Sequence, residues 1–194
     1  YASGFEMYRY DSSTLLRIVN PWQGADSVSQ WVFLSRDDEK PPKGFAGETI
    51  DVPVRRIVCM SSSYVAFLEA LGADSTICAI SGTGYIWSDK VRNRIAGGEI
   101  AEAGFDNSLN FEKLVALKPD VVFLYGLTGK NAVTDKLHEL GLKTVYIGDY
   151  VENNPLGRAE WITVFGEFTG RRELARTLFD SISNEYNRAK ALVS

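Results

Sequence analysis

The sequence predicts an α/β fold: a Rossmann-like lobe with a central parallel sheet flanked by helices, preceded by an antiparallel β meander. The main observation is a set of four short apolar runs, at residues 56–60, 76–80, 120–125 and 143–147, each followed by a helical stretch. Runs that stay apolar without alternating are typical of parallel strands covered by helices on both faces. Each run ends in small or polar residues, and open parallel sheets bind ligands at the carboxyl ends of their strands. We therefore expect the functional site at that edge.

The first 52 residues have a different composition. Three runs rich in β-forming residues, at 5–10, 15–19 and 30–34, are separated by the turn-forming segment 11–13, by Pro21 and by the charged, proline-containing segment 36–42. This spacing predicts the antiparallel meander. The α/β region begins near Pro53.

Helix signals follow each apolar run and fill the C-terminal part of the chain. Asparagine and serine are favoured N-caps, proline is tolerated at the first helical position, and glycine commonly follows the last turn. The first expected helix runs from Ser62 or Ser63 to Leu71, the second follows Gly84 and carries Ile86, Val91 and Ile95, and the third runs from Asn110 to before Pro119. The fourth carries Val133, Leu137 and Leu140 and ends at Gly141, and the fifth begins at Asn154-Pro155. The last follows Gly170, carries Leu174, Leu178, Ile182 and Tyr186 at intervals of four, and runs almost to Ser194.

Composition limits the function classes. A chain of 194 residues accommodates one sizeable domain, or a domain with an appendage. The formal net charge of -4 argues against nucleic-acid binding, which needs a basic surface. No apolar stretch reaches the length of a membrane span. Cys59 and Cys78 lie in two predicted strands, either as unpaired core residues or as a disulfide between neighbouring strands.

The segment after the second apolar run resembles the start of a dinucleotide-binding fingerprint. Gly82 and Gly84 follow a strand, but Trp87 stands where the third glycine is needed for helix–strand packing. The alternative is a turn that presents Tyr85 and Trp87 to a large flat or apolar ligand. Both rings could instead pack beneath the loop.

Other candidate residues have simpler explanations. The serines at 61–63 could hold an anionic or oxygen-rich ligand at a helix N-terminus, although N-capping accounts for at least one of them. The single histidine, His138, is expected on a helix surface, with no metal partner. By local reasoning, Glu112 complements the dipole of the helix that begins at Asn110. No nucleophile motif, phosphate loop or paired-carboxylate pattern indicates an enzyme.

Residues 110–122, NFEKLVALKPDVV, resemble the N-x-E-x-[IL]-x-x-L-x-P-D-[LV]-[VI] signature of ABC-transporter substrate-binding proteins for iron–siderophores, haem and cobalamin. Arg56-Ile57-Val58 with the later Glu69-Ala70-Leu71-Gly72, and residues 137–145, LHELGLKTV, resemble two further signatures of that family in the same order. The resemblance covers about residues 53–190.

This resemblance implies two α/β lobes joined by a long helix, with the ligand between them and no cofactor or enzymatic activity. The expected division is a β-rich extension (1–52), the N-terminal lobe (53–170) and the start of the connecting helix (171–194), with the second lobe absent. The implied partners are an iron chelate or a corrinoid and a membrane permease, at a periplasmic and lipid-anchored location. The resemblance assigns permease docking to Glu112, and its ligand contacts point to Ser62, Ser63, Tyr85, Trp87, Phe105 and Tyr125.

Two rival functions remain open at this stage. One is a small α/β enzyme that uses the same edge, which would need several convergent titratable groups. The other is a non-transport ligand-sensing module on the same fold.

Overall fold

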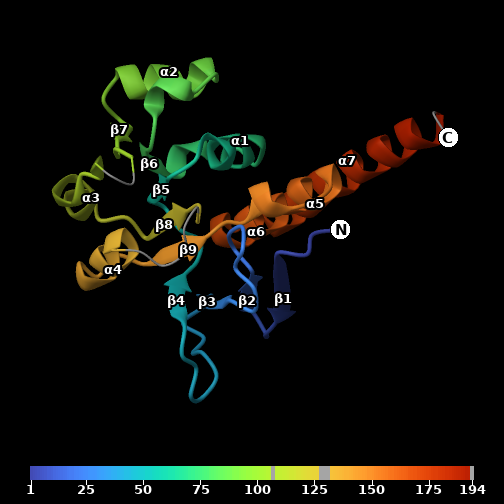
Figure 1. The fold of residues 1–194 in the computed structure, drawn as a ribbon, viewed down its shortest axis with the longest axis horizontal. Coiled ribbons are helices and arrows are strands. Elements are labelled where there is room, and N and C mark those ends of the chain that lie inside the picture. The colour runs from blue at the N-terminus through green and yellow to red at the C-terminus, as the bar shows by residue number, and fades with distance from the viewer. Residues whose placement is uncertain (106–107, 127–131, 193–194) are drawn as a thin grey trace.

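The computed structural model describes residues 1–105, 108–126 and 132–192. Its centre is a parallel sheet of five strands in the order β7-β6-β5-β8-β9 (Figure 1). The strands are β5 (Ile57–Cys59), β6 (Ile77–Ile80), β7 (Ala101–Glu102), β8 (Val121–Leu124) and β9 (Thr144–Tyr146). The predicted fold class is confirmed, and the four apolar runs are β5, β6, β8 and β9. The two-residue β7 was not predicted.

The N-terminal residues form a separate four-stranded sheet in the order β1-β2-β3-β4. Strands β1 (Phe5–Arg9), β2 (Thr14–Val19) and β3 (Ser29–Ser35) pair antiparallel, as the meander prediction requires. The fourth strand, β4 (Glu48–Asp51), pairs parallel to β3, so the sheet as a whole is mixed. Strand β4 was not predicted, because three of its four residues are charged or polar and a parallel pairing needs a crossover segment instead of a tight turn.

Seven helices are described. They are α1 (Ser62–Ala70), α2 (Asp89–Ala96), α3 (Phe111–Leu117), α4 (Ala132–Glu139), α5 (Pro155–Glu160), α6 (Ile162–Thr169) and α7 (Arg172–Leu192). The side chains of Ser61, Asn110 and Asn154 cap α1, α3 and α5 as N-cap residues. The second helix starts later than predicted, because the side chain of Ser88 accepts a hydrogen bond from the backbone N–H of Val91. Ile86 therefore precedes this helix.

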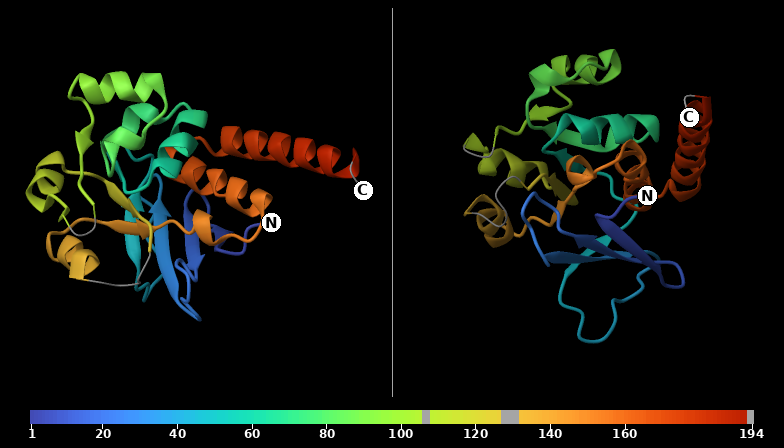
Figure 2. Two further views of the ribbon diagram at one scale, coloured as in Figure 1. Left: turned by 45° about the horizontal axis from the view of Figure 1, so that its top comes forward. Right: turned by 45° about the vertical axis from the view of Figure 1, so that its right-hand side comes forward.

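The five-stranded sheet is buried on both faces. On one face Ile57, Cys59 and Phe123 join a core that includes α1, α6 and the inner side of the four-stranded sheet. On the other face Val58 and Val122 pack with residues of α3 and α4. Because one continuous core contains residues of both sheets, the N-terminal sheet is packed against the α/β part of the molecule (Figure 2).

Aromatic rings from three elements meet in this core. Phe165 of α6 contacts Phe67 of α1 and Phe123 of β8, with ring centroids 5.0 and 5.1 Å apart. Cys59 and Cys78 are both buried and free, so the unpaired alternative holds. Burial raises the pKa of the Cys78 thiol, and its Sγ lies 3.3 Å from the carbonyl oxygen of Ile57. These cysteines act as small core residues.

Helix α7 extends away from the body of the molecule (Figure 1). The residues that it buries are Ala175, Phe179 and Ser183. Of the stripe predicted from intervals of four, Leu174 and Ile182 are 41% and 43% exposed, so the buried face is displaced by one residue. No helix in the described part of the chain combines the length and the apolar character needed to cross a membrane.

Candidate ligand-binding surface

Two adjoining depressions lie at the carboxyl edge of the five-stranded sheet, with volumes of about 540 and 220 Å³. They share Ser62 and Tyr85, and together they contain all six predicted ligand residues. The larger is lined by Ser62, Ser63, Val65, Ala66, Glu69, Tyr85, Ile86, Trp87 and Ser88, and the smaller by Met60, Ser61, Ser62, Ser81, Tyr85, Phe105 and Tyr125. The fold thus gathers residues from three strand-end loops and the start of α1. Their role in ligand binding remains a prediction.

The three serines at the start of α1 have different surroundings. Ser61 is the N-cap, and its Oγ accepts from the backbone N–H of Ser63 at 3.3 Å. The hydroxyls of Ser61 and Ser63 are 3.0 Å apart. Ser62 is exposed and lines both depressions. N-capping therefore accounts for Ser61, and Ser62 is the serine that faces the open surface.

The loop after β6 presents its aromatic residues outward. Trp87 is 92% exposed and Tyr85 is 69% exposed, although the residue between them, Ile86, is buried. On the far side of Trp87, the hydroxyl of Ser88 caps α2 and also bonds the carboxylate of Glu69. The alternative in which both rings pack beneath the loop is therefore wrong. A tryptophan on well-anchored backbone, with its ring in solvent, is typical of a contact surface.

The remaining two rings come from the ends of β7 and β8. Phe105 is 48% exposed, and Tyr125, immediately after β8, is half-buried. A Cβ atom built on Gly82 would lie 2.8 Å from the ring of Tyr85 and 3.4 Å from that of Phe105. Gly82 also has a φ of +76°, which favours glycine. The missing side chain at Gly82 thus allows Tyr85 and Phe105 to lie close together.

Two carboxylates at this edge, those of Glu102 and Asp149, were not predicted from the sequence. Glu102, the last residue of β7, accepts hydrogen bonds from residues of two of the loops. Asp149, just after β9, is buried, and burial raises its pKa, although a hydrogen bond from Ser63 acts in the opposite direction. Neither could be singled out from local sequence, because Gly82 and Thr83 lie 20 and 19 positions before Glu102, and Ser63 is far from Asp149 in the sequence.

Glu112 is exposed in the first turn of α3. The helix follows the strand-end loop of β7, so its N-terminus lies at the edge of the sheet that carries the candidate surface. Its neighbour Lys113 donates to the backbone oxygen of Glu102 at 3.5 Å. An exposed carboxylate in this place is available to a partner protein, and the docking role stays a prediction.

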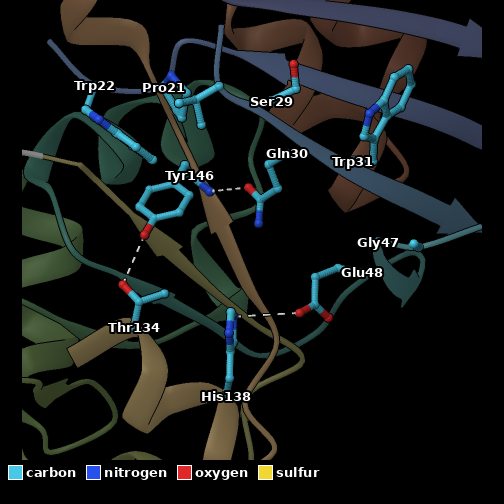
Figure 3. A pocket seen from close by; sticks show the side chains of 12 residues that line it. Pro21, Trp22, Ser29, Gln30, Trp31, Gly47, Glu48, Thr134, His138 and Tyr146 are labelled. Atoms are coloured by element: carbon cyan, nitrogen blue, oxygen red, sulfur yellow. Dashed lines mark hydrogen bonds and ion pairs between the residues drawn. The ribbon is translucent and has the colours of Figure 1, made fainter. Parts of the chain in front are cut away.

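A third cavity, of about 220 Å³, lies where the N-terminal sheet meets β9 and α4 (Figure 3). Its polar side chains bond to β9 and to one another. Gln30 donates to the backbone oxygen of Thr144 at 2.8 Å and accepts from the backbone N–H of Tyr146 at 2.9 Å. The Tyr146 hydroxyl lies 3.0 Å from that of Thr134.

His138 completes this set of contacts. Its Nε2 lies 2.6 Å from Thr144 Oγ1. The same nitrogen lies 3.7 Å from Glu48 Oε1 (Figure 3). His138 is exposed on α4, as predicted for a helix-surface residue. No group of three potential metal ligands occurs among the described residues. Since these polar groups already hold the two sheets together, we regard this cavity as a structural seam and the strand-end surface as the candidate site.

Comparison with known proteins identifies the family. Residues 57–194 match the family model described as periplasmic binding protein. The chain belongs to this family. An uncharacterized lipoprotein of Methanocaldococcus jannaschii is 29% identical over 95% of the chain and 49% of its own length. A second one from the same organism is 32% identical over 75% of the chain and 38% of its length. The chain therefore spans half or less of the length of these two relatives.

Solved periplasmic binding proteins share the fold. The periplasmic haem-binding protein HutB of Vibrio cholerae aligns with a TM-score of 0.57 and 21% identity, covering 70% of this chain and 49% of that one. The siderophore-binding protein BauB, bound to acinetobactin and ferric iron, aligns with a TM-score of 0.54 and 17% identity over 74% and 50% of the two chains. The family to which the chain belongs is one of binding proteins.

Proposed function

We propose that this chain forms one wall of the binding site of an ABC-importer substrate-binding protein, which captures an iron chelate (siderophore or haem) or a corrinoid. The observation that carries the proposal is Trp87, 92% exposed on an anchored loop beside Tyr85 and Phe105. Membership of the periplasmic binding protein family supports a binding role over the enzyme alternative.

The chemistry of the surface favours a large, partly apolar ligand. Aromatic faces at Tyr85, Trp87 and Phe105 offer stacking area, and hydroxyls at Ser62 and Tyr125 offer polar contacts. Iron chelates and corrinoids combine an extended, partly apolar body with polar groups at the rim. The names of similar solved proteins, which include haem-binding and siderophore-binding proteins, are consistent with this class.

We further propose that residues 1–52 form a β-rich extension, 53–170 the first lobe and 171–194 the start of a helix that leads to a second lobe. The relatives are about twice as long as this chain, which supports a missing second half. A ligand between two lobes is buried by two walls, and a single wall provides only part of that contact. The lipoprotein names of two relatives support an extracytoplasmic, lipid-anchored location.

Direct titration tests the ligand class. Haemin, a ferric trihydroxamate and cobalamin are each titrated into this chain and into a longer protein that carries the second half. We expect the longer protein to bind one of the three saturably, and the chain alone to bind it at least about 100-fold more weakly. Equal affinity would show that this lobe is a complete binding module. If the longer protein bound none of the three, the proposed function would be wrong.

Permease docking by Glu112 is tested separately. An exposed carboxylate can accept a bidentate arginine contact, which fixes orientation as well as charge. In the longer protein, Glu112→Ala should reduce transport while ligand affinity stays unchanged. Glu173→Ala is the matched control, because Glu173 is also exposed in the first turn of a helix. An equal loss of ligand affinity in Glu112→Ala would contradict the docking role.

A further inference from the structure

The carboxylate of Glu102 bonds two separate loops of the candidate surface. Its Oε1 accepts from the backbone N–H of Gly82 at 2.9 Å and from that of Gly104 at 3.0 Å. Its Oε2 accepts from Thr83, through the backbone N–H at 2.8 Å and the hydroxyl at 2.7 Å. One oxygen thus bridges the loop after β6 and the loop after β7.

These two loops carry three of the aromatic rings. Tyr85 and Trp87 follow Thr83 within four residues, and Phe105 follows Gly104 directly. Gly82 and Gly104 have positive φ values of 76° and 87°, so each loop turns at the residue whose N–H the carboxylate holds. Fixing these turns fixes the directions in which the rings leave the backbone.

The bonds involve no core group. Glu102 is exposed, it ends a strand of only two residues, and all its side-chain partners are loop groups at the ligand edge. Burial raises its pKa, but the hydrogen bonds from Thr83, Gly82 and Gly104 outweigh this effect and hold the pKa below its ordinary value. The carboxylate is therefore ionised, and able to accept at both oxygens, at neutral pH.

We propose that Glu102 is a positioning residue of the ligand surface, which ties the loop of Tyr85 and Trp87 to the loop of Phe105 so that the three rings meet the ligand in one arrangement. This proposal rests on the proposed ligand-binding function. Its effect on affinity comes from pre-organisation, since loops that are already ordered lose less conformational entropy on binding.

The first test needs no ligand. Amide hydrogen exchange is measured by NMR on this chain, on Glu102→Gln and on Glu102→Asp. Glutamine loses one acceptor oxygen, and aspartate keeps the charge but is one methylene shorter. We expect the amides of Gly82, Thr83 and Gly104 to exchange about 10-fold faster in both variants, the effect of losing one hydrogen bond to a charged group.

Two controls separate a local effect from a general one. The amide of Val122, which donates to Lys143 across β8 and β9, should keep its exchange rate. Glu139→Gln removes an exposed carboxylate on α4 and should behave as the unchanged chain. Unchanged exchange at the three loop amides of Glu102→Gln would overturn the proposal. Equal acceleration at Val122 would overturn it as well, because Glu102 would then stabilise the whole fold.

The second test measures binding of haemin, a ferric trihydroxamate and cobalamin by the longer protein. Both Glu102 variants should weaken the ligand that binds by about 10-fold, with Glu139→Gln unaffected. Unchanged affinity alongside faster loop exchange would refute the positioning role. If the unchanged protein bound none of the three, the proposed ligand class would be wrong. The hydrogen-exchange measurement alone would then decide whether Glu102 ties the two loops together.

Discussion

The strand-end surface and the seam cavity use polar groups in opposite ways. At the strand ends, the side chains of Glu102 and Ser88 accept hydrogen bonds from backbone N–H groups and fix the loops, while the rings of Trp87 and Tyr85 face solvent. In the seam, the side chains of Gln30 and His138 bond to Thr144 of β9, and both residues line the cavity. Exposed apolar side chains on a backbone fixed by hydrogen bonds indicate a ligand surface. Polar side chains bonded to a neighbouring element indicate a structural contact between the two sheets. Changes in the two regions should therefore separate binding from stability.

The largest expected effect is on binding. Trp87→Ala should weaken the ligand that the longer protein binds by about 100-fold, as for an interface aromatic at the centre of a contact. The melting temperature should stay the same, since an exposed side chain contributes little to folding. Tyr8→Ala is the control, because Tyr8 is an exposed aromatic residue on β1, outside both regions. If Trp87→Ala unfolded the chain, the ring would stabilise the fold, and its role as a ligand contact would be refuted.

Substitutions in the seam should lower stability without changing ligand affinity. Gln30→Ala removes both hydrogen bonds to β9 and should lower the free energy of unfolding by about 2 kcal/mol, measured by urea denaturation. Ligand affinity should not change. Gln23→Ala changes the same residue type at an exposed position and should be neutral. A loss of affinity in Gln30→Ala with unchanged stability would make the seam the binding site and reverse the comparison.

A smaller effect is expected at Tyr146. Removing its hydroxyl in Tyr146→Phe takes away the contact with Thr134 and should lower stability by about 1 kcal/mol. Tyr8→Phe removes an exposed hydroxyl that bonds Glu6 and should have no measurable effect. Equal urea midpoints for the two variants would show that the Tyr146 hydroxyl does not help to hold β9 and α4 together.

The smallest effect concerns Asp149 and depends on pH. Its pKa in the folded protein is raised by burial above the ordinary value of 3.8, so the folded state binds the proton more tightly than the unfolded state. The stability that this group contributes is complete below pH 3.8 and is lost as the pH rises through the folded pKa. Asp149→Asn should therefore raise the melting temperature at pH 7 by on the order of 2 °C and leave it unchanged in acid. A larger increase in melting temperature in acid than at pH 7 would contradict the predicted direction of the pH dependence.

The sequence predicted those features that depend on neighbouring residues. Four apolar runs identified the strands, and capping residues such as Asn110 identified helix starts. The strand-end rule identified the edge of the sheet, and the family resemblance pointed to six residues there that the structure brings together. Contacts between residues far apart in the sequence could not be predicted. Gln30 lies 114 positions from Thr144, and nothing local distinguishes it from any other glutamine.

Helix α7 illustrates a second limit. Leu174, Ile182 and Tyr186 form the more apolar stripe, yet the body of the protein packs against Ala175, Phe179 and Ser183. Small side chains allow close approach, and which face is buried depends on the partner elements as well as on hydrophobicity. Periodicity therefore predicted the helix but not its orientation.

Gln30 has one further consequence. Strand β9 ends the five-stranded sheet, and a terminal strand exposes unpaired N–H and C=O groups that can recruit a strand from another molecule. The carboxamide of Gln30 carries the same donor and acceptor as a peptide group, and it takes up the N–H of Tyr146 and the carbonyl of Thr144. A single side chain thus pairs with two backbone groups of β9 that would otherwise be open to a strand from another molecule.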